Sequence, residues 1–147
     1  MNKFLLTQPR TALSVLRISV ALVFFIHAAV RIANHTIPQF SLFFQSKGFP
    51  YPTILVWIIT VFELGGSVLL ALNLFTKWLS IGFFILLLIG IILIHWQLGW
   101  FVGEHGTGGS EYSFILMVCL YYIWTHSIVK KTKEPDSLSL SAEDLTC

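Results

Sequence analysis

Four long apolar segments restrict how this chain can fold more than any other feature of the sequence. A transmembrane helix needs about 20 predominantly apolar residues to cross a hydrocarbon core of about 30 Å. The segments that meet or approach this length are residues 11–32, 52–75, 78–98 and 112–129. The sequence therefore predicts an all-α integral membrane protein, a four-helix bundle that lies in the lipid bilayer.

The composition excludes the main soluble classes. Of the 147 residues, 56% are hydrophobic and 11% are charged, whereas an average globular chain carries about 25% charged residues. A soluble enzyme or a disordered chain does not fit these values. A net charge of +2 is too small for a nucleic-acid partner. Cys119 lies in an apolar run and Cys147 ends the chain, so we expect neither a disulfide framework nor a metal site.

The chain divides into a membrane domain and a polar tail. Residues 1–129 hold the four spans, and residues 130–147 are polar and free of aromatic side chains, which predicts a disordered cytoplasmic tail. The connection over residues 34–51 contains several prolines and the apolar run FSLFF, which is typical of a short interfacial helix between the first and second spans. A cleaved signal peptide is the rival interpretation of the first span, but no clear cleavage site follows it.

Basic residues beside the spans predict the orientation of the chain. One side of the membrane would carry Lys3, Arg10, Lys77, Lys130, Lys131 and Lys133. The other side has Lys47, with Arg31 at its edge, and a connection between the third and fourth spans without Lys or Arg. We therefore expect both termini in the cytoplasm.

Ionisable residues inside the spans are the strongest functional signal. Each costs at least about 2.5–3.5 kcal/mol near the bilayer centre, so it persists where it pairs, faces a cavity or serves a function. At about 100° per residue, Arg17, His27 and Arg31 share one stripe of the first span. Glu63 lies near the midplane of the second span, where a lone carboxylate would be protonated or paired. By depth, Glu63 lies between Arg17 and His27, and the long side chain of Arg17 could reach it.

Further polar residues extend this set toward the outer surface. His95 is roughly level with His27, and Glu111 opens the fourth span on the same side as Arg31. Together they predict a polar path from Glu63 to an outer vestibule. The alternatives are that the arginines extend to lipid headgroups and that the pair made by Glu63 serves assembly and not chemistry.

Three sequence elements resemble the DoxX family of small four-helix membrane proteins. They are RISVALVFFIHAAVRI, ELGGSVLLALNLFTKW and GTGGSEYSFILM, and they extend over residues 16–117. The family usually has a glycine where Ala28 stands, a lysine where Arg31 stands and a glycine near Asn73. Because arginine is not equivalent to lysine in geometry or pKa range, Arg31 argues against any chemistry that needs a neutral amine.

The resemblance implies a function in membrane redox reactions, because DoxX-like proteins include a small subunit of a thiosulfate:quinone oxidoreductase and members of complexes that respond to oxidative stress. It also implies a bacterial cytoplasmic (inner) membrane. The residues of this chain that match the family pattern are Arg17, His27, Arg31, Glu63 and Glu111. His95 is added to this set only because its expected depth in the membrane is close to that of His27.

The leading hypothesis is a subunit of a quinone-linked redox complex, with a partner redox protein or further copies of the chain. Glu63, Arg17 and His27 would serve the chemistry, and His27, Arg31, His95 and Glu111 would hold the quinone. A haem held by His27 and His95 is a minor alternative. The second hypothesis is a non-enzymatic assembly or accessory protein whose buried ion pair is structural. The third is a small transporter. Four spans are few for a transporter, and the sequence contains no pair of broken, repeated helices of the kind that transporters use.

Overall fold

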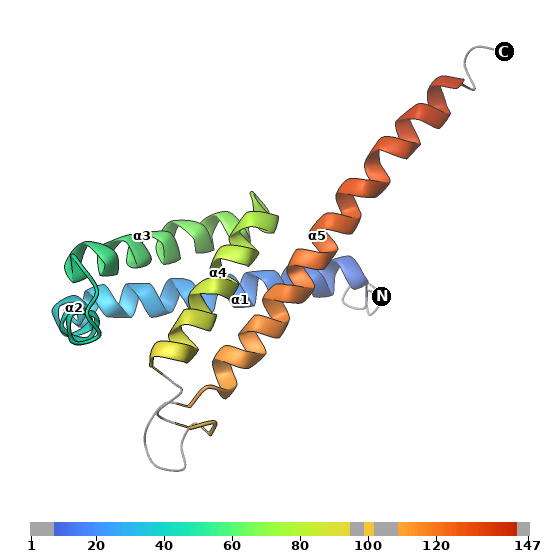
Figure 1. Ribbon diagram of the computed structural model, residues 1–147. Helices are drawn as coiled ribbons and strands as arrows, with labels where there is room; N and C mark the ends of the chain where they lie inside the picture. Colours follow the sequence, from blue (N-terminus) through green and yellow to red (C-terminus); the bar gives the residue numbers. More distant parts are fainter. Residues whose placement is uncertain (1–7, 95–98, 102–108, 144–147) are drawn as a thin grey trace. The chain divides into compact units, whose positions relative to one another are not determined.

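The computed structural model describes residues 8–94, 99–101 and 109–143, with side chains described as far as residue 129. All regular structure in these residues is helical. The helices are α1 (Pro9–Ala33), α2 (Ile37–Ser46), α3 (Pro52–Ala71), α4 (Thr76–Leu93) and α5 (Glu111–Glu143) (Figure 1). Four helices within the described residues are long and apolar enough to cross a membrane. The predicted all-α class and its four spans are confirmed.

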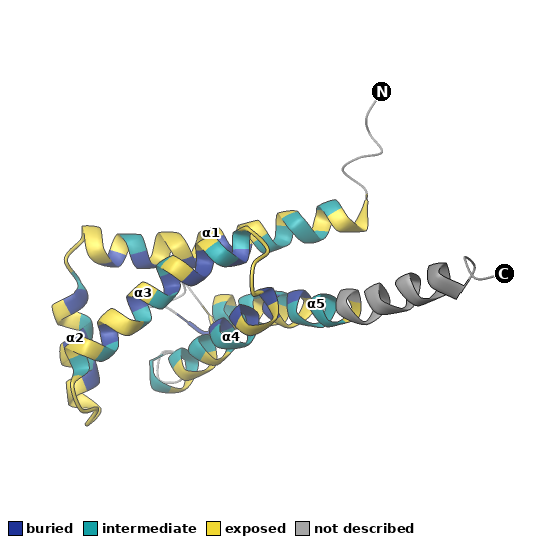
Figure 2. Ribbon diagram, turned by 90° about the horizontal axis from the view of Figure 1, so that it is seen from above, coloured by how far each residue is buried: buried dark blue, intermediate teal, exposed yellow. Residues whose placement is uncertain are grey.

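Contacts group the helices into two compact units, Met1–Phe75 with α1, α2 and α3, and Thr76–Cys147 with α4 and α5. In the first unit, α1 and α3 run antiparallel side by side and α2 joins them at one end (Figure 1). The buried residues of α1 recur every three or four positions, and α3 presents a matching buried stripe. This spacing places each stripe on one helix face, and Figure 2 shows these buried stripes between exposed outer faces.

The outer faces of the first unit are apolar. Val15, Ile18 and Leu22 of α1 and Ile58 and Val61 of α3 are each at least half exposed. Because lipid tails are as apolar as leucine, such faces need no cover in a bilayer, and the helices associate through packing and polar contacts instead. This unit is therefore built for lipid surroundings, and its few buried polar residues stand out.

The short helix expected between the first two spans is α2. Its ten residues are too few to span a bilayer, and it packs against α3 with Ile37, Ser41 and Phe44 buried. Its aromatic side chains contact one another, with the Phe40 and Phe44 ring centroids 4.8 Å apart. One face of α2 thus closes the end of the α1–α3 pair.

Three helices end four or more residues away from the predicted limits of their spans, and one of them is α4, which ends at Leu93 and not at residue 98. Helix α3 ends at Ala71 and not at residue 75, because Asn73 and Phe75 adopt positive φ angles of 63° and 50° in a turn before α4. Asparagine tolerates this left-handed region better than most residues, so Asn73 suits the turn. Helix α5 continues to Glu143, so the backbone is helical over residues 130–143, where the composition predicts disorder.

In the second unit, α4 packs against α5, and the start of α5 is hydrogen-bonded to residues 99–101. The backbone nitrogens of Ser110 and Glu111 donate to the carbonyl oxygens of Gly99 and Trp100 at 3.2 Å each. A side chain at Gly109 would collide with the backbone of residues 100–101. Glycine at this position therefore permits the close approach that fixes the beginning of α5.

Candidate functional site

A buried ion pair joins the two spanning helices of the first unit. The Arg31 guanidinium donates from Nη1 to Oε2 of Glu63 at 2.7 Å. Arg31 is 7% exposed and Glu63 is 4% exposed. Helix α1 contributes the cation from its last turn, and α3 contributes the anion from its middle. A charge pair this deep in two apolar helices is the feature most in need of a functional or structural explanation.

The direction of the side chains explains why Arg31 reaches Glu63. Side chains on a helix lean toward its N-terminus, and α1 and α3 are antiparallel (Figure 1). Arg31 therefore leans back along α1 toward the middle of the pair, while Glu63 leans toward the end where α1 meets α2. The two side chains converge and close the axial distance between their backbones.

Two further residues complete the surroundings of the guanidinium. Nη1 of Arg31 also donates to the hydroxyl oxygen of Thr60 at 2.9 Å, and that hydroxyl donates to the Val56 carbonyl at 2.8 Å. The Phe40 ring of α2 lies 5.0 Å from the guanidinium carbon, a distance suited to a cation–π contact. Arg31 is thus held by all three helices of its unit. We call Arg31, Thr60 and Glu63 the buried triad.

Arg17 does not pair with Glu63, which corrects the contact expected from depth. Its Nη1 donates to Oδ1 of Asn73 at 2.7 Å, near the far end of α3. The lean that brings Arg31 toward Glu63 carries Arg17 away from it, toward the N-terminus of α1 and the C-terminal end of α3. The depth estimate compared backbone positions alone and so selected the wrong arginine.

The other predicted site residues lie in different surroundings. His27 is exposed on α1, one turn before Arg31. Glu111 is half-buried in the first turn of α5, in the second unit, where a carboxylate stabilises the helix N-terminus. His95 lies outside the described residues. Of the predicted set, the structure brings Arg31 and Glu63 into direct contact.

Sequence reasoning missed three partners of the two arginines: Thr60, Phe40 and Asn73. A signal existed for Thr60, because a polar residue three positions before Glu63 lies on the same helix face. Phe40 becomes a partner only through the turn between α1 and α2, and Asn73 only through the turn after α3. Among the described residues, no group of three or more His, Cys, Asp or Glu is placed to hold a metal ion.

Comparison with known proteins identifies the family. The DoxX family model matches residues 12–96, more than half of the chain. This chain belongs to the DoxX family. No curated protein and no solved structure matches it. DoxX membership and the four apolar helices together establish an integral membrane protein.

The DoxX match includes Arg17, Arg31, Thr60 and Glu63, so the whole buried triad falls inside the family region. It ends before GTGGSEYSFILM, the third element that resembles the family, and so does not include Glu111. The DoxX region therefore contains the Arg31–Glu63 ion pair.

Proposed function

We propose that this DoxX protein is a subunit of a quinone-linked membrane redox complex, an oxidoreductase or an oxidative-stress complex, and that the buried triad is its proton-handling element. The observation that carries the proposal is the Arg31–Glu63 pair at 2.7 Å, nearly enclosed between two spans. The redox link of DoxX-like proteins supports the choice of a quinone. A partner redox protein, or further copies of this chain, would complete the complex.

In this proposal each residue of the buried triad has a separate role. A bound quinone supplies reversible transfer of two electrons and two protons. Glu63 holds or releases a proton at Oε2, and Arg31 stabilises its carboxylate form through the charge-assisted hydrogen bond. Thr60 keeps the guanidinium in place through its oxygen. His27, exposed on α1 one turn before Arg31, is the group that would donate to a ring carbonyl. Arg17, His95 and Glu111 remain predictions for the wider site.

The alternative is an assembly protein in which the triad is structural. Its supporting observation is that the pair joins α1 to α3 directly, with Thr60 already accepting from Arg31. Buried pairs of this kind can specify how helices associate without serving chemistry. Under this alternative the partner chain carries all the redox chemistry.

The variant Glu63→Gln tests the proposal. Glutamine keeps the shape and an acceptor oxygen but cannot exchange the proton. We expect a folded protein that inserts normally and whose membranes lose most reduction of an added short-chain quinone. Glu143→Gln, the same exchange at the end of α5, is the matched control. A folded Glu63→Gln protein with unchanged quinone reduction would overturn the catalytic role.

A double variant separates the two functions. Arg31→Met with Glu63→Met removes both charges and replaces them with apolar side chains of similar volume. Such a replacement of a buried ion pair often leaves the stability of the protein unchanged or raises it. If the triad handles protons, the double variant folds and assembles but does not support quinone reduction. If the triad is structural, the double variant restores assembly and quinone reduction together.

The proposed location is a bacterial cytoplasmic membrane with both termini inside. Cys147 provides the probe, in a Cys119→Ala background that leaves one thiol. A membrane-impermeant maleimide should label Cys147 only after the membrane is opened. Ser46→Cys at the end of α2, in a background without Cys119 and Cys147, should be labelled in intact cells. The reverse pattern would overturn the orientation.

A further inference from the structure

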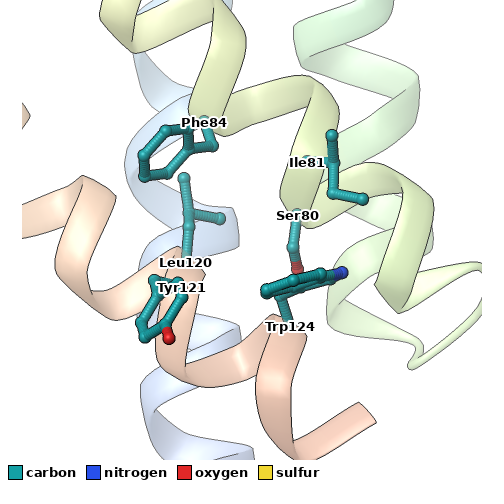
Figure 3. Close-up of a pocket in the computed structure, with 6 residues that line it drawn as sticks. All are labelled: Ser80, Ile81, Phe84, Leu120, Tyr121 and Trp124. Atoms are coloured by element: carbon teal, nitrogen blue, oxygen red, sulfur yellow. The ribbon is translucent and has the colours of Figure 1, made fainter. Parts of the chain in front are cut away.

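A pocket lies between α4 and α5 in the second unit, apart from the buried triad. It has a volume of about 300 Å³ and is lined by Ser80, Ile81, Phe84, Leu120, Tyr121 and Trp124 (Figure 3). The surface that these residues present to the pocket is apolar throughout, because the Ser80 hydroxyl and the Trp124 indole nitrogen are buried. An occupant of this pocket is therefore recognised through a hydrocarbon part.

The size and place of the pocket suit a lipid chain. An apolar cavity of about 150 Å³ holds one benzene ring, so a pocket twice as large has room for a chain segment of roughly ten carbon atoms. The pocket is partly open, and its residues come from two helices that are long and apolar enough to cross a membrane. An acyl chain of a neighbouring lipid can therefore enter it without leaving the hydrocarbon layer.

One charged residue lies in line with this pocket on α4. Lys77 precedes Ile81 by four residues and Phe84 by seven, so at about 100° per residue the three lie within a sector of about 60°. Lys77 belongs to the first turn of α4, and the pocket residues of that helix follow about 5–10 Å farther along its axis. A phospholipid has the same order, with a charged headgroup first and its acyl chains deeper in the bilayer.

The surroundings of Lys77 are those of a residue at the membrane surface. Its side chain is exposed, and its ammonium nitrogen lies 5.3 Å from the centroid of the Trp78 ring. Trp78 is 69% exposed, and an exposed tryptophan at the end of a span is typical of the headgroup level. Lys77 forms no ion pair within the described part of the chain, and α4 contains no acidic residue. The charge at this end of the pocket is therefore complementary to an anionic headgroup, which the N-terminus of α4 also favours.

We propose that the α4–α5 pocket binds one anionic phospholipid. One acyl chain packs against Ile81, Phe84 and Leu120, and the phosphate lies beside Lys77 at the start of α4. The site does not rest on the proposed function, because Lys77 and all six lining residues belong to the second unit. It would exist equally if the buried triad were purely structural.

Native mass spectrometry of the full chain in mild detergent measures the bound lipid. The protein is equilibrated with equal amounts of phosphatidylglycerol, which is anionic, and phosphatidylcholine, which has no net charge. We expect one phosphatidylglycerol to be retained in preference to phosphatidylcholine. Lys77→Gln removes one charge near the headgroup, and the preference should fall about fivefold. Lys47→Gln is the matched control and should keep the preference of the parent, because this exposed lysine also lies over an aromatic ring, that of Phe43 at 5.6 Å, but belongs to the first unit.

A second variant tests the place of the acyl chain. Ile81→Trp puts a larger side chain into the pocket and should lower retention of both lipids about tenfold, the effect of removing two buried CH₂ groups. Ile92→Trp is the matched control and should retain lipid as the parent does, because Ile92 is 60% exposed and lies outside the pocket. A parent without preference between the two lipids, or a variant that behaves as its control does, would overturn the proposal. A dimer without bound lipid would also overturn it, because a second copy of the chain would then cover the pocket.

Folding of the variants need not limit the test. The natural sequence labelled with 5-fluorotryptophan gives a fluorine resonance for each tryptophan, and Trp124→Phe identifies the one in the pocket. A phosphatidylglycerol with a nitroxide on its acyl chain, as a minor component of phosphatidylcholine nanodiscs, should broaden the Trp124 resonance more than that of Trp57, which is 45% exposed on α3. Equal broadening of the two resonances by this lipid would indicate general contact with the bilayer and would contradict a site. Equal broadening of Trp124 by phosphatidylcholine with the same label would contradict recognition of the anionic headgroup.

Discussion

The two units treat their buried polar groups differently. The first unit buries two charges and pairs them within itself, through the 2.7 Å contact of Arg31 with Glu63. The second unit buries a hydroxyl and an indole N–H group, on Ser80 and Trp124, for which the described residues offer no partner. The charges of this ion pair are satisfied within their own unit, whereas these two neutral donors, like Nε of Arg17 in the first unit, have no hydrogen-bond partner in the part of the chain that is described.

The difference follows from the cost of each kind of group. An unpaired charge near the bilayer centre costs at least about 2.5–3.5 kcal/mol, so a charge must find its partner in the same fold. A neutral hydroxyl or N–H group without a partner costs about 1–3 kcal/mol, which a folded chain can tolerate. The fold can therefore leave a neutral donor without a partner, whereas the Glu63 carboxylate and the Arg31 guanidinium are paired.

The largest expected effect comes from breaking the ion pair. Glu63→Met leaves the guanidinium of Arg31 buried without its anion, and arginine does not lose its proton in proteins. We expect a loss of about 3–5 kcal/mol in the free energy of unfolding, measured by denaturation in mixed micelles. Adding Arg31→Met should recover most of this loss. A single variant as stable as the parent would show that the two charges do not depend on each other.

The next effect should come from Thr60. Thr60→Val keeps the branched shape and removes the oxygen that accepts from Arg31 at 2.9 Å. We expect a loss of about 1–2 kcal/mol in the free energy of unfolding. Thr60→Ser retains the hydroxyl and should remain near the parent. If Val and Ser at this position behave alike in the same denaturation measurement, the hydroxyl does not support the guanidinium.

Much of this arrangement follows from the sequence. Runs of apolar residues are long enough to fix the spans, and the prolines and phenylalanines of residues 34–51 indicate the short helix that became α2. On energetic grounds alone, a carboxyl group at mid-span such as that of Glu63 must be either paired or protonated. These features depend on local composition and on the thickness of the bilayer.

The partners themselves depend on three-dimensional details that composition does not contain. The choice of Arg31 over Arg17 follows from the lean of side chains on antiparallel helices. The contact of Phe40 with Arg31 requires the turn before α2, where His35 has a φ of 52°. The pocket lined by Ser80 and Trp124 depends on which faces of α4 and α5 meet. The sequence does not indicate these faces, because both helices are hydrophobic on every side.

Arg17 should have a smaller effect than either member of the ion pair. Its bond to Asn73 lies at an exposed position, where such contacts contribute about 1 kcal/mol or less. Arg17→Gln should therefore lower the free energy of unfolding by no more than this amount, with Arg10→Gln as a control outside the apolar part of α1. A loss as large as that of Glu63→Met would indicate that Arg17, and not Arg31, neutralises the carboxylate.

The smallest expected effect, and the one that tests the comparison most directly, is that of Ser80→Ala on the ligand-free protein. Removing a hydroxyl that has no partner removes a cost and no bond, so the free energy of unfolding should stay constant or rise by up to about 1 kcal/mol. Ser41→Ala, which removes a hydroxyl bonded to the Ile37 carbonyl at 2.9 Å, should not gain stability. The same denaturation measurement compares the two serines. If Ser80→Ala loses as much stability as Ser41→Ala or more, the hydroxyl of Ser80 is already satisfied in the folded protein, and the two units do not differ in this respect.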